Sequence, residues 1–174
     1  MNNQLNSEAC SAILDTAKSI YYEEIDRFKQ AETKIGIAIA FTGVIFGAFL
    51  TFVNLNSINQ TSLGFGLTLY SSLFKLIILA LLVSSFYQFF KAMQIDDFQQ
   101  IDIDSIVDSE FAKYESQARV KFDIAVTYKK AIVQNEEKIA NKLNRYNNGL
   151  RFVAYAFAMF VTHYVVEGII KYGT

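Results

Sequence analysis

The pattern of hydrophobic and polar positions predicts a chain of long helices, with apolar stretches long enough to cross a membrane. From Ile35 to Val53, nineteen residues contain no charge, proline, asparagine or glutamine. An α-helix needs about 20 apolar residues to cross the hydrocarbon core of a bilayer. The sequence therefore predicts a first transmembrane helix over residues 35–55.

Two further apolar stretches follow. Residues 66–91 form the second predicted span, although it contains Lys75. Residues 149–171 form a third, which is less apolar because His163 and Glu167 interrupt it. A packed soluble or interfacial helix is the alternative for this last stretch. The Asn147-Asn148-Gly149 sequence before it is expected to break or kink the chain.

The polar parts of the chain also favour helices. Residues 1–34 are predicted to form a cytoplasmic amphipathic helix that Asn6 or Ser7 caps and that runs without interruption into the first span. Residues 92–148 are predicted to form an acidic linker, ending at a cap on Asp104 or Ser105, and then a long basic helix. The apolar stripe expected on the first helix consists of Ile13, Ala17, Ile20, Tyr21, Phe28, Ala31 and Ile35.

Small residues form a separate pattern in the first span. Gly36, Ala40, Gly43 and Gly47 follow one another at intervals of four, three and four residues, so they share one side of a helix. Gly43 and Gly47 make a GxxxG pair, which allows two helices to approach closely in lipid. We expect this side to contact either another helix of the chain or a second copy of it.

Composition and charge support an all-α membrane protein with two to three transmembrane helices and long cytoplasmic helices, assembled as a helical bundle oligomer. Of 174 residues, 52% are hydrophobic and 19% charged, and there is no proline. Four Lys or Arg lie in residues 1–34 and ten in 91–151, but none lies in the turn at 56–66. The positive-inside rule then places the N-terminus in the cytoplasm.

Charged residues inside the predicted spans suggest a pair. Lys75 lies sixteen residues from Lys91, and Glu167 lies sixteen from Arg151, so both are about 24 Å from the cytoplasmic edge. At equal depth in antiparallel neighbours, the two can form an ion pair, with His163 one turn inward. The alternative is that each side chain extends separately to the headgroups.

Sites for catalysis or metal binding are not evident. The chain has one cysteine and one histidine, so neither a zinc site nor an intrachain disulfide is expected. It also lacks a glycine-rich phosphate loop and a Ser/His/Asp set. We therefore predict a protein that is not an enzyme, with no catalytic residues, no metal and no cofactor.

Several residues carry a likeness to a known family. An acid-Thr-Lys tripeptide begins the first span, Tyr, Asn and Lys are spaced along the basic helix, and Leu-Arg precedes the last apolar stretch. This order resembles the Pycsar transmembrane effectors of bacteria over about residues 15–170; the related SLATT-type effectors share the layout. The matching residues are Glu32-Thr33-Lys34, Tyr128, Asn135, Lys142 and Leu150-Arg151.

The resemblance implies an anti-phage effector of the bacterial inner membrane. Such effectors bind cCMP or cUMP from a cognate cyclase, impair the membrane and cause abortive infection. The partners implied are membrane lipid, the cyclic nucleotide and further copies of the chain, with no nucleic acid. Basic side chains can hold the phosphate and tyrosine can stack on the base. The candidate ligand-binding residues are Lys34, Arg119, Tyr128, Lys130, Asn135, Lys138, Lys142 and Arg145.

Three other functions remain open at this point. The chain can be a cyclic-oligonucleotide-gated effector, a membrane toxin that needs no ligand, or a scaffold that binds a partner chain. The basic helix has eight Lys or Arg against three acids between Arg119 and Arg151. That excess is also expected of a solvated face near an anionic membrane surface.

Overall fold

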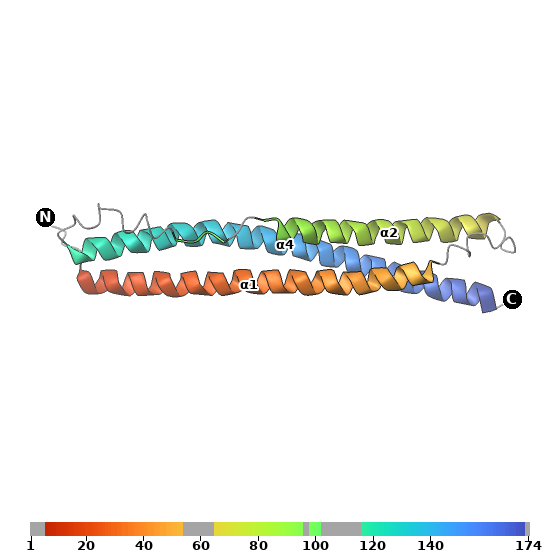
Figure 1. Ribbon diagram of the computed structural model, residues 1–174, viewed down its shortest axis with the longest axis horizontal. Coiled ribbons are helices and arrows are strands. Elements are labelled where there is room, and N and C mark those ends of the chain that lie inside the picture. The colour runs from red at the N-terminus through yellow and green to blue at the C-terminus, as the bar shows by residue number, and fades with distance from the viewer. Residues whose placement is uncertain (1–5, 54–64, 96–97, 102–115, 173–174) are drawn as a thin grey trace. The chain divides into compact units, whose positions relative to one another are not determined.

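A computed structural model describes residues 6–53, 65–95, 98–101 and 116–172 of the chain. Its elements are the helices α1 (Ser7–Phe52), α2 (Phe65–Met93) and α4 (Gln117–Tyr172) (Figure 1). No strand occurs among these residues, so the predicted all-α class is confirmed. All three helices are long and apolar enough to cross a membrane. The predicted cap at Asp104 or Ser105 lies outside the described residues.

The chain forms two compact units. Unit 1 consists of Met1–Ala31 and Ile95–Asn141, and unit 2 consists of Glu32–Gln94 and Lys142–Thr174. Both α1 and α4 therefore contribute residues to each unit, whereas α2 belongs to unit 2 alone.

Helix α1 begins where a polar side chain can satisfy its first backbone donors. Asn6 Oδ1 accepts hydrogen bonds from the backbone N–H groups of Glu8, at 2.9 Å, and Ala9, at 3.3 Å. Asparagine is among the best helix-capping residues for this reason. The helix then continues without a break through Phe52, as the sequence predicted.

A seven-residue repeat sets the buried side of α1. Its buried positions include Leu14, Tyr21, Phe28, Ile35, Thr42 and Phe49. A spacing of seven keeps these side chains on one face, as in coiled coils. The predicted stripe was partly wrong, because Ile13 and Ile20 are 48% and 42% exposed. Leu14, which was not in the stripe, is buried, whereas Tyr21 is buried as predicted.

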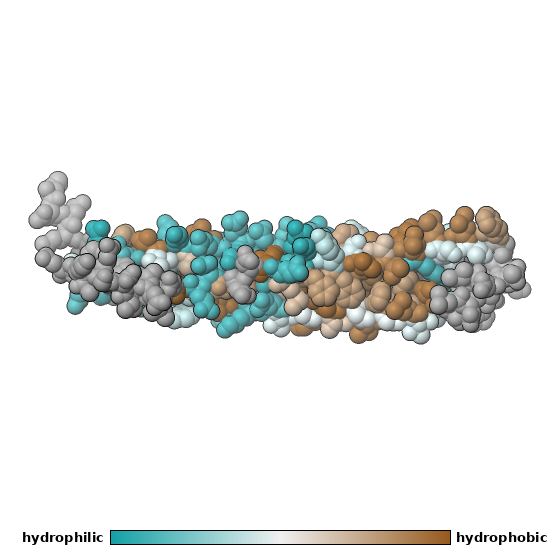
Figure 2. All heavy atoms as spheres, turned by 45° about the horizontal axis from the view of Figure 1, so that its top comes forward, coloured by the Kyte–Doolittle hydropathy of each residue, from teal (hydrophilic) through white to brown (hydrophobic). Residues whose placement is uncertain are grey.

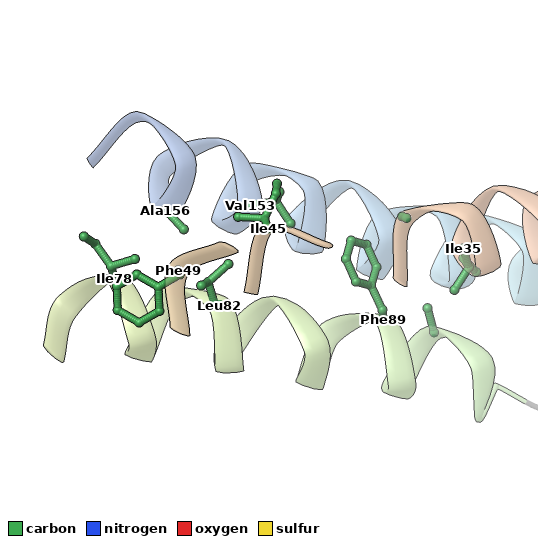
Figure 3. Packing of buried hydrophobic residues seen from close by; sticks show 10 residues of the cluster. Ile35, Ile45, Phe49, Ile78, Leu82, Phe89, Val153 and Ala156 are labelled. Carbon is green, nitrogen blue, oxygen red and sulfur yellow. The ribbon is translucent and has the colours of Figure 1, made fainter. Parts of the chain in front are cut away.

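Unit 2 is a three-helix packing of α1, α2 and α4. The direction of α2 is opposite to that of the other two (Figure 1). Apolar side chains from all three helices interlock in its core, including Ile35, Ile78 and Phe89, each with 0% exposure (Figure 3). If lipid surrounds these helices, van der Waals packing of this kind holds them together, because lipid is as apolar as the core itself.

Gly149 sits inside α4 and does not end it. Of the two outcomes expected for Asn147-Asn148-Gly149, a break or a kink, the break is excluded, because α4 runs without interruption from Gln117 to Tyr172. Gly149 instead lets α2 come close. The ring of Phe89 occupies the place where a Cβ would be, and Ser85 Oγ donates to the Gly149 carbonyl at 3.1 Å.

The two units differ in the side chains on their surfaces. Hydrophilic residues dominate the visible face of unit 1, and hydrophobic residues dominate that of unit 2 (Figure 2). In unit 2, Val44 is 71% exposed, Ile37 65% and Leu76 63%. Apolar side chains exposed in this number are typical of a surface that contacts lipid or another protein.

Candidate functional site

Aromatic side chains gather around Tyr21 in unit 1. The centroid of its ring lies 5.3 Å from that of Tyr128 and 5.4 Å from that of Phe98. Phe28, seven residues after Tyr21 on α1, lies 5.6 Å from Phe98 on the same measure. Centroid distances of this size are those at which aromatic rings attract one another. We call these four residues the aromatic cluster.

Asn135 binds main-chain atoms of Gln99, the residue that follows Phe98 of this cluster. Its side chain is completely buried. Its Oδ1 accepts the backbone N–H of Gln99 at 2.6 Å, and its Nδ2 donates to the Gln99 carbonyl at 3.1 Å. A buried amide left without such partners would cost about 1–3 kcal/mol, so these two bonds hold Gln99 firmly.

The hydroxyl of Tyr21 binds the same short segment. It donates to the Gln99 carbonyl at 3.4 Å and accepts the backbone N–H of Ile101 at 3.2 Å. Residues 98–101 are not helical, so they lack the internal hydrogen bonds that a helix provides. The side chains of α1 and α4 supply replacements in partly buried hydrogen bonds, which satisfy backbone groups that would otherwise lack partners within the chain.

The aromatic cluster also changes the acidity of Tyr128. Burial raises the pKa of its hydroxyl, and the neighbouring Tyr22 and Tyr21 raise this pKa further. The hydroxyl therefore stays protonated beyond the pH at which an exposed tyrosine ionises. At neutral pH, Tyr128 offers an uncharged ring and a hydroxyl group that can donate.

Lys142 is the third residue in this series on α4. Tyr128, Asn135 and Lys142 follow at intervals of seven, so they share one face of the helix. Lys142 belongs to unit 2, where its Nζ lies 3.0 Å from Glu32 Oε1. Its side chain is 1% exposed, against 51% for that of Glu32. The predicted tripeptide and the predicted lysine are therefore in contact.

The other candidate residues are divided between the two units. Arg119 and Lys130, in unit 1, are exposed, and Arg119 faces Asp123 at 3.5 Å. Lys138 is half-buried in the same unit. In unit 2, Lys34 is exposed and Arg145 Nη1 donates to Gln88 at 3.2 Å. Within the described part of the chain, Tyr128 belongs to the aromatic cluster and Asn135 binds residue 99 of the segment 98–101.

A polar cluster lies within the apolar part of unit 2. Lys75 Nζ is 2.9 Å from Glu167 Oε1, so the predicted contact is present. Ser71 Oγ donates to the same carboxylate oxygen, and His163 Nε2 lies 3.2 Å from it. Three polar side chains therefore converge on one carboxylate. This is how charged groups in apolar surroundings are usually accommodated.

His163 is enclosed by aromatic rings. It is 0% exposed and stacks on Phe74, with ring centroids 5.7 Å apart. Phe52 packs its ring edge-on against it at 6.0 Å. Among the described residues, neither ring nitrogen has a partner in hydrogen-bond geometry. The imidazole is therefore held mainly by packing.

The stripe of small residues faces away from the chain's own helices. Gly36, Ala40, Gly43 and Gly47 are exposed. A Cβ added at any of the three glycines would meet no atom within 4 Å. Contact with another helix of the same chain, one of the two expected partners, is therefore not seen at the three glycines among the described residues. The alternative, contact with a second copy of the chain, stays a prediction.

Some functional contacts had no sequence signal. Phe98 and Gln99 lie in the acidic linker, and their partners are far away along the chain. Ser71 was missed because a serine inside an apolar stretch usually bonds its own helix. The hydroxyls of Thr42 and Thr51 do so, at 2.7 Å from Ala38 O and 2.9 Å from Gly47 O.

The chain was also compared with known protein families, curated sequences and solved structures. No protein-family model, curated protein sequence or solved structure matches the chain.

Proposed function

We propose that this protein is an anti-phage effector of the bacterial inner membrane, which impairs the membrane when it binds cCMP or cUMP. The sequence resemblance to the Pycsar transmembrane effectors suggests the ligand and the biological role. A cyclic pyrimidine mononucleotide carries one flat base and one negative charge. Its recognition calls for aromatic rings, an amide or hydroxyl group, and basic residues.

The observation that carries the proposal is that Asn135 binds the backbone of Gln99, next to Phe98 of the aromatic cluster to which Tyr128 also belongs. Both residues belong to the series that suggested the family, and both lie in unit 1 with Tyr21. Asn135 presents a donor and an acceptor side by side, which suits the edge of a pyrimidine. Rings of Tyr21 and Tyr128 suit its face.

The route from binding to membrane damage follows from helix continuity. Helices α1 and α4 each pass from unit 1 into unit 2 without a break. In this proposal, a ligand that favours one packing of unit 1 also shifts the equilibrium of unit 2. The ligand must bind that packing more tightly, since equal affinity for both packings would shift nothing. Further copies of the chain would contact one another through the exposed glycine stripe.

The test is loss of membrane potential in bacteria that express the protein. Cells also carry a cyclase that makes cCMP, a cyclase that makes cUMP, or an inactive cyclase, and a potential-sensitive dye reports depolarisation. We expect depolarisation with one active cyclase only. An Asn135→Ala variant should remain polarised, whereas Asn141→Ala, at an exposed position of the same helix, should behave as wild type. Equal depolarisation with the inactive cyclase would favour a ligand-independent toxin instead.

A non-catalytic scaffold is the second candidate, because a specific observation favours it. Asn135 and Lys142 already have partners within the chain, Gln99 and Glu32. Such contacts are also what a purely structural role would need. If this candidate is right, neither cyclase depolarises the cells and the protein is recovered with a partner chain. A response to a cyclic oligonucleotide alone would favour an effector of the SLATT type.

A further inference from the structure

The segment 98–101 occupies the side chains that are best suited to read a base. Asn135 uses both ends of its amide on Gln99. The ring of Phe98, the preceding residue, packs against Tyr21 and Phe28. Tyr21 and Phe28 therefore already bind a six-membered ring, that of Phe98, and Asn135 already binds a donor and an acceptor, the backbone N–H and carbonyl of Gln99.

The chemistry of this occupant matches that of a pyrimidine base. The backbone of Gln99 offers Asn135 one N–H donor and one carbonyl acceptor. Uracil offers the same pair, through N3–H and a neighbouring carbonyl. Cytosine offers it through its amino group and N3. Asparagine reads such paired edges on bases with two parallel hydrogen bonds, and aromatic side chains stack on the face of an unpaired base.

We propose that residues 98–101 are an internal competitor for the nucleotide, which binds by displacing them from Asn135, Tyr21 and Phe28. This inference rests on the proposed function and names the site and the regulation that go with it. The base takes the place of the Phe98 ring against Tyr21, and its polar edge takes the place of the Gln99 backbone. The sugar and phosphate then extend toward solvent.

Competition explains why the polar groups of the site are satisfied before a ligand arrives. A buried amide without partners is costly, so an empty site of this kind would collapse or misfold. A segment held by a few side-chain contacts can be exchanged for a ligand that offers equivalent bonds. Release of 98–101 also frees residues that join α2 to α4 along the chain. In this way, nucleotide binding acts on the segment that follows α2 and precedes α4 in the sequence.

Two variants separate competition from a structural role. Asn135→Ala removes the group that both occupants use, so the nucleotide should no longer bind. Phe98→Ala weakens only the internal occupant, because Phe98 is absent from the bound state. Loss of a half-buried phenyl ring should therefore make cCMP or cUMP bind about three- to tenfold more tightly. A merely structural Phe98 would leave the affinity unchanged or weaken it.

Hydrogen–deuterium exchange on the full-length protein in lipid nanodiscs tests the displacement directly. The amides of Gln99 and Ile101 are bonded to side chains, so a peptide that covers both should be protected without nucleotide. We expect added cCMP or cUMP to remove this protection, to the level seen in Asn135→Ala. Phe98→Ala should show partial loss of protection without ligand, whereas the exposed-site control Asn141→Ala should match wild type.

The outcomes distinguish the two proposals. If a nucleotide binds and depolarises cells but protection at 98–101 is unchanged, the competition is wrong and the proposed function stands. Weaker or unchanged binding in Phe98→Ala would also overturn the competition. If neither nucleotide binds the wild-type protein, both proposals fail.

Discussion

Replacing Gly149 by alanine tests how closely α2 and α4 pack in unit 2. The added Cβ would lie 2.5 Å, 2.8 Å and 2.9 Å from three atoms of the Phe89 ring. Ordinary contacts begin at 3.4 Å, so the ring must move by about 0.9 Å. Phe89 is completely buried in the core of unit 2 and has little room to do so.

The change in the free energy of unfolding is the sum of two destabilising contributions and one stabilising contribution. Overpacking of this kind costs about 1–3 kcal/mol. A shift of α2 also weakens the hydrogen bond from Ser85 to the Gly149 carbonyl, for about 0.5–1.5 kcal/mol. Alanine gains up to about 1 kcal/mol over glycine inside a helix. We therefore expect the free energy of unfolding to fall by about 1–3 kcal/mol.

The assay is denaturant-induced unfolding in mild detergent, followed by far-ultraviolet circular dichroism. Gly168→Ala is the matched control on the same helix, because its Cβ would meet no atom within 4 Å. It should be neutral or slightly stabilising. Adding Phe89→Leu to Gly149→Ala should restore part of the loss. Equal effects of Gly149→Ala and Gly168→Ala would refute the close approach of the two helices.

Three further predictions concern other parts of the molecule. Lys75→Leu alone should destabilise more than Lys75→Leu with Glu167→Leu, because the single change leaves a carboxylate unpaired in apolar surroundings; unfolding in detergent measures this. The contribution of the protonated Tyr128 hydroxyl to the free energy of unfolding should be complete below about pH 10 and should decrease at higher pH, because Tyr128 loses its proton at a lower pH in the unfolded state than in the folded state. Tyr128→Phe should reduce this decrease, as measured by unfolding at alkaline pH. Gly43→Leu and Gly47→Leu should lower the oligomer size measured by light scattering in detergent, without unfolding the chain.

Each of these has an opposite outcome that would count against it. Additive losses in the Lys75 and Glu167 cycle would mean that the two side chains act independently. An alkaline unfolding curve identical in Tyr128→Phe would mean that this hydroxyl titrates normally. An unchanged oligomer in both leucine variants would mean that the glycine stripe is not a contact surface.

The helices were predictable because their signals are local. A run of nineteen residues without charge, proline, asparagine or glutamine predicts a helix of spanning length, and Asn6 before Glu8 marks the start of α1. The contact of Lys75 with Glu167 was also predictable, since both lie sixteen residues from a basic residue at the edge of a span. Equal distances along two antiparallel helices place Lys75 and Glu167 at the same depth, where their side chains can meet.

The buried face of α1 was harder, because two apolar stripes lie side by side. Ile13 and Leu14 are equally hydrophobic, and only the position of the partner helices decides that Leu14 is buried. The glycine stripe raises the same difficulty. A sequence places it on one side of a helix but does not say whether the partner is the same chain or another copy.

The contacts of residues 98–101 could not be predicted from the sequence. Gln99 contributes only its backbone to Asn135, so its own side chain carries no signal. The two residues are 36 positions apart, and a contact of this kind depends on how the whole of unit 1 packs. Asn135 was among the predicted ligand-binding candidates, but its partner in the structure, Gln99, was not predicted.

In the proposed function, a cyclic pyrimidine mononucleotide controls the effect of this protein on a membrane. The most direct measurement is ion leak from vesicles of phosphatidylethanolamine and phosphatidylglycerol that contain the purified protein. Addition of cCMP or cUMP should start the leak, in proportion to nucleotide bound, and Asn135→Ala should abolish it. Leak that is the same with either nucleotide and without any would contradict the claim.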